Sequence, residues 1–239
     1  DPPLSGPENM GRDDLLLERV GAGAAPPTLR FYTWDPPTIS LGYFQKYAEY
    51  EALPPPAGEL AVVRRPTGGG AILHDQELTY AVALPLGHAL LAGGPNCLYE
   101  RMHAAVIAAL GGSASRAAPC GVSDDSGPAK GPFFCFARRH RFDVVLGEGK
   151  LVGSAQRRTQ QAVLQHGSIM LATRYAQQPV ATVGAVAPLS ARELAERVTA
   201  ALGEANGIDW EIGGWGEEEL EGAAAFVERH GSAAWLRRV

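Results

Sequence analysis

Apolar and polar residues alternate in short runs over most of the first 170 positions of the chain. This period-two pattern predicts β-strands, and the Pro, Gly and Asp residues between the runs predict the turns that separate them. Two of the runs flank Gly147-Glu148-Gly149 and therefore predict a hairpin. We predict strands at residues 28–34, 38–41, 60–64, 77–84, 142–146, 150–152 and 162–171.

Four segments instead show apolar residues at helical spacing. Gly111-Gly112 closes the second of them, and Ser190 with Glu193 predicts a capping box at the start of the third. Between the second helix and the hairpin, residues 113–132 are rich in Gly, Pro, Ala and Ser and predict a flexible loop. We predict helices at residues 9–20, 98–110, 190–202 and 217–230.

The order of these elements predicts the fold class. Strands dominate up to about residue 171 and helices follow, so we expect one α/β (α+β) domain. Its sheet is expected to be mixed, mostly antiparallel and flanked by helices. We assign residues 8–178 to the core of this domain and residues 179–239 to a helical C-terminal part packed on it. Tyr43 and Phe44 are expected in the core, although Phe44 and Gln45 could instead face a ligand of the sheet.

Composition narrows the class of protein. Of the 239 residues, 46% are hydrophobic and 20% charged, which are globular values, and no apolar run reaches membrane-spanning length. A net charge of -5 argues against a nucleic-acid partner. Cys97, Cys120 and Cys135 are odd in number and irregularly spaced, so a reducing compartment is favoured over a disulfide framework. The residues present show no signal-peptide pattern, and we expect a soluble cytoplasmic protein.

Two motifs are candidates for chemistry. Three consecutive glycines, Gly68, Gly69 and Gly70, lie between two β-prone runs, where exposed backbone N–H groups could approach a carbonyl or a phosphate. The loop lacks the spacing of a P-loop or of a dinucleotide fingerprint, and an ordinary turn is the alternative. CxxC and HExxH motifs are also absent, so we expect neither a metal nor another cofactor.

The second motif is the predicted hairpin. Lysine occurs only at Lys46, Lys130 and Lys150, whereas arginine supplies the other cations, and a lysine can shift its pKa and move a proton. A plain hairpin lysine or biased base composition would explain Lys150 equally well. The small residues Gly153-Ser154-Ala155 follow it and mark a place where a ligand or another backbone comes close.

These motifs together resemble one known family. Arg65-Pro66-Thr67-Gly68-Gly69-Gly70-Ala71, His74-Asp75, Lys150-Leu151-Val152-Gly153-Ser154-Ala155-Gln156 and Gln165-His166-Gly167-Ser168 occur in the order found in the biotin/lipoate A/B protein ligase superfamily. The resemblance covers about two thirds of the chain. It implies the biotin/lipoate ligase-like catalytic fold.

Within that superfamily, Cys135-Phe136 stands where octanoyltransferases of the LipM type carry a cysteine, and Lys150 matches the family lysine. The resemblance implies transfer of an octanoyl group from octanoyl-acyl carrier protein to a lysine of a lipoyl domain, such as glycine-cleavage H protein. Alternatives are an ATP-dependent lipoate-protein ligase acting through lipoyl adenylate, a lipoyl-domain amidotransferase, and a degenerate paralogue that only binds lipoyl domains.

The resemblance also implies roles. We hypothesise that the Lys150 ammonium stabilises a Cys135 thiolate, which takes the octanoyl group as a thioester, and that a neutral Lys150 later acts as base. Backbone N–H groups near 153–155 or 68–70 could hold the oxyanion. A basic cluster (Arg138, Arg139, His140, Arg141, Arg157 and Arg158) either steers an acidic partner or is a solvated strand edge. Candidate substrate-binding residues are Arg65, Gly68, Gly69, Gly70, His74, Gly153, Ser154, Ala155, His166 and Gly167, of which the two histidines could also be purely structural.

Overall fold

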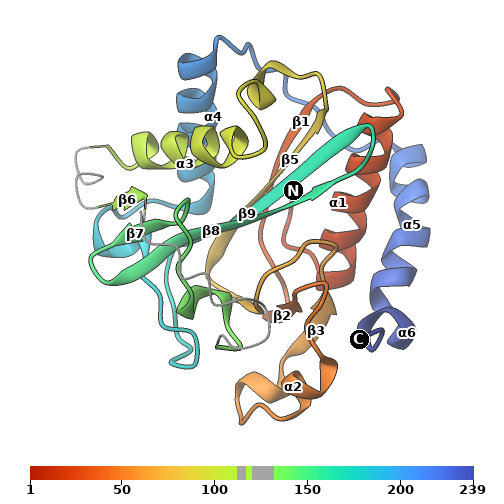
Figure 1. Ribbon diagram of the computed structural model, residues 1–239, viewed down its shortest axis with the longest axis vertical. Helices are drawn as coiled ribbons and strands as arrows, with labels where there is room; N and C mark the ends of the chain where they lie inside the picture. Colours follow the sequence, from red (N-terminus) through yellow and green to blue (C-terminus); the bar gives the residue numbers. More distant parts are fainter. Residues whose placement is uncertain (112–116, 120–131) are drawn as a thin grey trace.

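The computed structural model describes residues 1–111, 117–119 and 132–239, and Figure 1 shows their arrangement. A larger and a smaller β-sheet are flanked by helices, which confirms the predicted fold class. Cys120 and most of the predicted flexible loop 113–132 lie outside the described residues.

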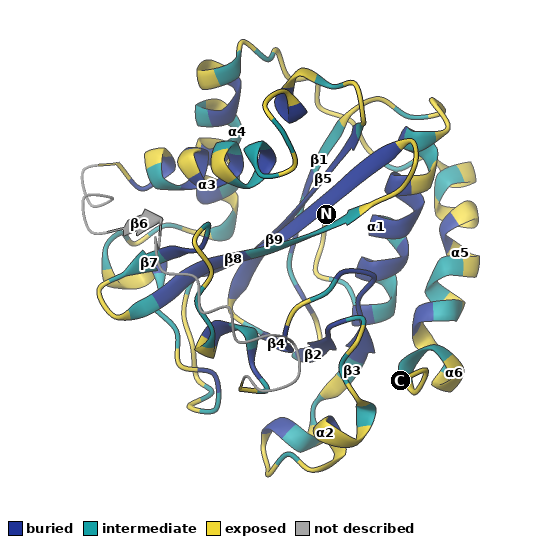
Figure 2. Cartoon of the chain, in the orientation of Figure 1, coloured by how far each residue is buried: buried dark blue, intermediate teal, exposed yellow. Residues whose placement is uncertain are grey.

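The larger sheet has six strands in the order β1-β5-β9-β8-β7-β6, and every neighbouring pair is antiparallel. Strands β5 and β9 lie inside the sheet and are buried along almost their whole length, because helices cover both faces (Figure 2). The strands are β1 Thr28–Tyr32, β5 Glu77–Pro85, β6 Ala117–Pro119, β7 Val144–Leu146, β8 Gly149–Arg158 and β9 Ala162–Met170.

The smaller sheet has three strands in the order β3-β2-β4. Strand β2 pairs in parallel with β3 and antiparallel with β4, so the strand pairing of the whole protein is mixed and mostly antiparallel, as predicted. The strands are β2 Thr38–Leu41, β3 Ala61–Arg64 and β4 Ile72–His74.

The two faces of the larger sheet carry different helices. On β5, Tyr80 and Val82 pack in one hydrophobic cluster with α3 and α4, whereas Ala81 and Ala83 pack in another with α1. This alternation is the period of a strand buried on both sides. Helix α5 covers the outer side of α1 (Figure 1). The longer helices are α1 Gly6–Gly21, α3 Cys97–Ala109, α4 Ala191–Asn206 and α5 Glu217–Gly231.

Short helical turns connect these elements. Among the described residues two of these are α-helices and four are 3-10 turns, and one of the 3-10 turns contains Cys135. None of the helices in the described part of the chain is long and apolar enough to cross a membrane. The short elements are α2 Tyr47–Glu51, α6 Ala233–Leu236, η1 Ala57–Glu59, η2 Ala89–Leu91, η4 Cys135–Ala137 and η5 Val183–Ala185.

The predicted start of α4 is confirmed, whereas the predicted length of the return strand and the predicted burial of Phe44 are not. Ser190 caps α4 and forms the predicted capping box with Glu193. The predicted return strand 150–152 is much too short, because β8 continues to Arg158 along β9. The expectation that Phe44 lies in the core is wrong, since the residue is 72% exposed. The buried Arg64 side chain donates to three backbone carbonyls of residues 42–45, which fixes this turn with the Phe44 ring outside.

Candidate active site

One cavity of about 480 Å³ lies between the larger sheet and the smaller sheet with its glycine loop. Its mouth is formed by partly exposed side chains such as Tyr99, Arg138 and Arg139, and its far end by buried ones such as Trp34 and Thr79. The structure brings all twelve predicted site residues to its wall. These are Arg65, Gly68, Gly69, Gly70, His74, Cys135, Lys150, Gly153, Ser154, Ala155, His166 and Gly167.

The floor of the cavity is a row of residues that crosses four strands. Tyr32 pairs with Thr79, Thr79 with Ser168, and Ser168 with Gly153. Directly paired residues of antiparallel strands point to the same face, so this row runs across one side of the sheet. Its side chains become small toward β8, which leaves the space above them open.

Cys135 is held against the glycine loop by backbone pairing. Its N–H donates to the carbonyl of Ala71 at 2.7 Å, and the N–H of Ala71 donates to the carbonyl of Phe133 at 2.9 Å. A Cβ atom at Gly70 would lie 3.1 Å from the backbone nitrogen of Cys135, so a side chain there would push the two segments apart. The glycine therefore lets the loop and the cysteine segment lie in contact.

Lys150 projects from the start of β8 toward this cysteine. Its Nζ lies 3.7 Å from Sγ of Cys135 and 2.8 Å from Oδ2 of Asp143. The side chains of Lys150 and Asp143 are only 3% and 6% exposed. A Cβ atom at Gly153 would lie 2.8 Å from Nζ and 2.5 Å from Cε, so only glycine leaves room for the lysine side chain.

The surroundings of Lys150 favour its charged form. Burial lowers its pKa, but the negative charges of a Cys135 thiolate and of Asp143 outweigh burial, so the pKa of Lys150 is raised above its ordinary value. In the resting protein Lys150 is therefore an ammonium ion. The predicted role of a neutral lysine as base does not apply to that state.

Arg65 organises the glycine loop. Its Nη2 donates to the carbonyls of Gly68 and Gly70, both at 2.7 Å, while Nη1 and Nε bond Ser40 and Thr67. All five of its donors are thus used within the protein. Burial lowers the pKa of Arg65 to about 10, against an opposing effect of the Cys135 thiolate, and the group stays charged at pH 7. It adds a second positive charge on the thiol's side of the cavity.

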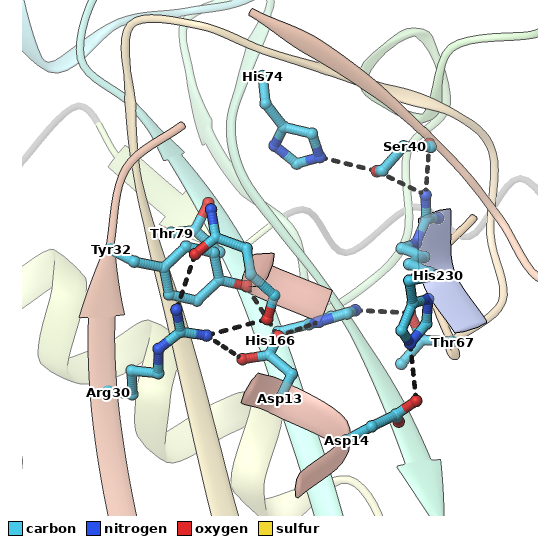
Figure 3. Close-up of polar contacts among 12 residues, drawn as sticks. Asp13, Asp14, Arg30, Tyr32, Ser40, Thr67, His74, Thr79, His166 and His230 are labelled. Carbon is cyan, nitrogen blue, oxygen red and sulfur yellow. Dashed lines mark hydrogen bonds and ion pairs between the residues drawn. The ribbon is translucent and has the colours of Figure 1, made fainter. Parts of the chain in front are cut away.

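The two predicted histidines belong to buried polar networks, part of which Figure 3 shows. His166 lies between Asp13, at 3.1 Å from Nδ1, and Thr67, at 2.6 Å from Nε2. Arg30 in turn pairs with Asp13 at 2.7 Å. This chain of contacts joins helix α1 to the glycine loop through β9.

His74 lies in a second network at the far end of the cavity. Its Nδ1 is 2.7 Å from Glu77 and its Nε2 is 2.7 Å from the hydroxyl of Ser40. Its ring stacks on Trp34 with centroids 3.8 Å apart. Burial lowers the pKa of His74 despite the opposing charge of Glu77, so the ring is neutral at pH 7.

Sequence reasoning missed several residues of this site. Asp143 is the most important, and its signal is weak: one carboxylate at the start of the strand that pairs with the lysine strand. Asp13, Trp34 and Thr79 lie in predicted helices or strands, and nothing in their local sequence indicates a place in the site. Among the described residues no group of three or more His, Cys, Asp or Glu side chains could hold a metal ion.

Known proteins share sequence and fold with this chain. The model of the lipoyl protein ligase A/B catalytic domain matches residues 5–211. Octanoyltransferase LipM of Moorella thermoacetica is 43% identical over 171 residues, which cover 68% of this chain and 60% of that protein. Octanoyltransferase LipM of Symbiobacterium thermophilum is 40% identical, over 70% of this chain and 61% of that protein. The matched part thus spans about three fifths of the length of these relatives.

The fold has relatives among solved structures. A crystal structure of lipoate-protein ligase A bound with ATP superposes with a TM-score of 0.78 at 21% identity and covers 99% of this chain and 96% of that one. At this identity the likeness concerns the fold. The family model, however, matches residues 5–211, and the two transferases are 43% and 40% identical to this chain. These similarities show that the chain belongs to the lipoyl protein ligase A/B catalytic domain family.

Proposed function

We propose that the protein is an octanoyltransferase that moves an octanoyl group from octanoyl-acyl carrier protein to a lysine of a lipoyl domain through a thioester on Cys135. The observation that carries this proposal is the 3.7 Å approach of the Lys150 ammonium to the Cys135 sulfur in the wall of a cavity. A ligase that adenylates its substrate has no use for a nucleophile at this position. The name of the two transferase relatives supports the same reading.

In the first half-reaction the Cys135 thiolate attacks the thioester carbonyl of the donor. A new C–S bond forms to Cys135, the C–S bond to the carrier breaks, and the carrier thiolate takes a proton from the Lys150 ammonium. Lys150 stabilises the attacking anion, and Asp143 at 2.8 Å keeps the lysine in place and charged. Cysteine suits this step because its thiolate is a strong nucleophile near neutral pH.

The second half-reaction needs a base. The acceptor lysine attacks the thioester, a C–N bond forms, and the bond to Cys135 breaks to release the thiolate. Once Cys135 is acylated its negative charge is gone, and with it the largest effect that raises the pKa of Lys150. Lys150 then gives up its proton more readily than in the resting state, which suits it to pass protons during aminolysis.

The oxyanion of both tetrahedral intermediates needs hydrogen-bond donors beside Cys135. A Cβ atom at Gly69 would lie 4.0 Å from the sulfur, so the glycine loop runs next to the reacting atom. Within residues 1–111, 117–119 and 132–239, the N–H groups of Gly69 and Gly70 make no hydrogen bond to the protein. These two amides are the donors that we assign to the oxyanion.

The macromolecular substrates approach at the mouth of the cavity. Arg138, Arg139 and His140 line it, and His140 is exposed. The two arginines offer positive charge to an acidic carrier or lipoyl domain, such as glycine-cleavage H protein, and would speed their encounter. No metal or other cofactor is part of this scheme.

The test supplies three donors in parallel to the purified protein and an apo lipoyl domain, whose mass is then measured. With octanoyl-acyl carrier protein and no ATP, we expect one octanoyl group on the lipoyl domain, and none with Cys135→Ala. Modification that occurs only with free octanoate and ATP would replace the proposal by a ligase. Modification that occurs only with an octanoylated lipoyl domain as donor would replace it by an amidotransferase.

A further inference from the structure

We infer that the exposed ring of Phe44, with Arg138 and Arg238 near it, forms the surface on which the acceptor lipoyl domain docks. This inference rests on the proposed function and deepens it, because it gives one of the two macromolecular substrates a defined place beside Cys135. It is carried by the exposure of Phe44, by the contacts that fix its position, and by the short reach of the acceptor's lysine.

The turn of residues 42–45 holds an aromatic ring in solvent. Phe44 is 72% exposed, and its ring meets only the edge of Tyr43, with centroids 4.9 Å apart, among the described aromatic rings. The turn itself is fixed, because the buried Arg64 guanidinium donates to three of its carbonyls. Aromatic side chains are enriched at protein interfaces, and a ring on a fixed turn loses little freedom when a partner covers it.

This turn touches both segments that carry the reactive groups. A Cβ atom at Gly42 would lie 1.9 Å from the carbonyl oxygen of Gly69, so the turn lies against the glycine loop. The side-chain amide of Gln45 donates to the carbonyl of Phe133 at 3.1 Å. Phe133 is two residues before Cys135, which is at most ~7 Å along the chain. The exposed ring therefore lies outside the cavity but beside the segment that carries the thiol.

Positive charge lies close to this ring. The guanidinium carbon of Arg238 lies 4.0 Å from the centre of the Tyr43 ring, which the exposed ring meets. Arg138 donates to the carbonyl of Pro132, the residue before the one that the turn bonds. Among the described residues neither arginine pairs with a carboxylate, whereas the arginine beside each of them in the sequence does. Both charges are therefore available to an acidic partner.

The lengths of the two substrates' arms decide which partner this is. An extended chain advances ~1.2 Å per bond, so the five bonds from Cα to Nζ of the acceptor lysine span ~6 Å. The phosphopantetheine arm of an acyl carrier has about fourteen bonds and spans ~16 Å. A lipoyl domain must therefore press its own surface against the residues next to Cys135, whereas the carrier can load the thiol from further away. Phe44 lies where the short arm requires contact.

The two half-reactions distinguish the partners. Phe44→Ala should acylate Cys135 from octanoyl-acyl carrier protein within about 2-fold of the wild-type rate. With an apo lipoyl domain as acceptor, kcat/KM for discharge of the acyl-enzyme should fall by about 10- to 100-fold, and kcat should change much less. Ile212→Ala removes another exposed apolar side chain, between α4 and α5 at the end of the molecule away from α2 (Figure 1), and should alter neither step.

The charge of Arg238 is tested through salt. Arg238→Glu should lower kcat/KM for the lipoyl domain by about 10-fold at ~0.05 M salt and by less than about 3-fold at ~0.5 M, because salt screens exposed charges. Arg192→Glu makes the same change in net charge on the exposed side of α4 and should change neither value. Equal effects of the two reversals would remove Arg238 from the docking surface.

A binding measurement keeps this inference apart from the chemistry. Calorimetry of the unacylated protein with an apo lipoyl domain should show a dissociation constant about 10- to 100-fold higher for Phe44→Ala than for wild type or Ile212→Ala. That result would stand even if no acyl-enzyme formed, in which case only the transferase proposal would fail. A folded Phe44→Ala protein that binds the lipoyl domain like wild type, or that loses acylation by the carrier as much as transfer to the acceptor, would overturn the inference.

Discussion

The two ends of one cavity are built on opposite principles. At the reactive end a thiol, an ammonium and a carboxylate meet within hydrogen-bonding range, and Cys135 remains partly accessible. At the far end Trp34, Thr79 and His74 are buried, and their polar atoms bond to other protein groups. Charged groups face the sulfur at the first end. At the second end the hydrogen-bond donors are already paired within the protein, and only Oε2 of Glu77 is a buried acceptor without a partner among the described residues there.

The contrast extends to two buried bases on either side of the sheet. Lys150 faces Asp143 and the thiol, and its pKa is raised although burial alone would lower it. His103 faces the hydroxyl of Ser154 and the carbonyl of Phe142, and burial lowers its pKa to about 4. Equal burial thus gives opposite charge states, because the partners differ. Lys150 keeps its charge because the Asp143 carboxylate lies beside it, whereas His103 has only neutral partners among the described residues.

The largest effect on the reaction rate is expected at the reactive end of the cavity. Replacing Lys150 by Met should slow acylation of Cys135 by about 10²- to 10⁴-fold. The Cys135 thiolate then lacks its positive partner, and the departing carrier thiolate lacks its proton donor. Rapid quenching and mass analysis would measure the rate. The ratio of rates for octanoyl and decanoyl donors should change by less than about 2-fold (~0.4 kcal/mol), because the far end of the cavity does not contact Lys150.

Lys150→Met also leaves Asp143 as a buried charge without its partner, which costs about 3–5 kcal/mol of stability. The double variant Lys150→Met/Asp143→Asn removes both charges and should regain most of that stability. If it also regained the acylation rate, Lys150 would be a structural residue and the difference between the two ends would disappear.

The second prediction concerns the stability of the protein in acid. The folded pKa of His103 is about 4, whereas an unfolded histidine titrates near 6.5, so between these values the unfolded chain binds more protons. Stability from this residue is therefore complete above about pH 6.5 and is lost as the pH falls toward 4. The loss is on the order of 3 kcal/mol.

Urea unfolding of wild type and His103→Gln at several pH values would measure this loss. The variant should be less stable at pH 7 but should lose less stability between pH 6.5 and pH 4. Parallel pH profiles of the two proteins would show that His103 is not held neutral by burial.

The third prediction sharpens the geometry around Lys150. In Gly153→Ala the new methyl would lie 2.8 Å from Nζ and 2.5 Å from Cε, so the end of the Lys150 side chain must move from its place beside Cys135 and Asp143. We expect about 10-fold slower acylation, because small displacements of a catalytic group are costly. Gly87→Ala adds the same methyl where no atom lies within 4 Å, and it should acylate at the wild-type rate. A Gly153→Ala enzyme of full activity would show that the position of Lys150 is not critical.

The smallest effect, a change in stability, is expected at the far end of the cavity. Thr79→Val keeps the shape of the side chain but removes the acceptor of the Trp34 N–H, which leaves a buried donor unpaired. The free energy of unfolding should fall by about 1–2 kcal/mol in denaturant titrations. An unchanged value would show that hydrogen bonding does not hold the indole in place.

The sequence predicts much of this site for a local reason. Gly68–Gly70, Lys150 and Gly153–Ala155 lie in short contiguous motifs, and the structure places all of them in the lining of the same cavity. The order of strands and helices likewise follows from the period of the hydrophobic pattern and from helix-capping residues, both of which depend on residues that are near in the sequence.

What the sequence does not predict depends on long-range partners. Asp143 lies beside Lys150 only because β7 pairs with the start of β8. Trp34 lies at the far end of the cavity in contact with His74 and Thr79, which belong to other strands. Phe44 looks like a core residue by type, but the bonds from Arg64 to the turn place its ring outside. Such partners are far apart in the chain, so their contacts produce no periodic pattern in the sequence.

Intact-mass analysis of the protein after mixing with octanoyl-acyl carrier protein in the absence of ATP is the most direct test of the acyl-enzyme. The account predicts the gain of one octanoyl group on the peptide that contains Cys135, its release by hydroxylamine, and its loss when an apo lipoyl domain is added. Cys135→Ala should gain nothing. An unmodified wild-type protein that still octanoylates the lipoyl domain, or a thioester that the lipoyl domain cannot discharge, would contradict it.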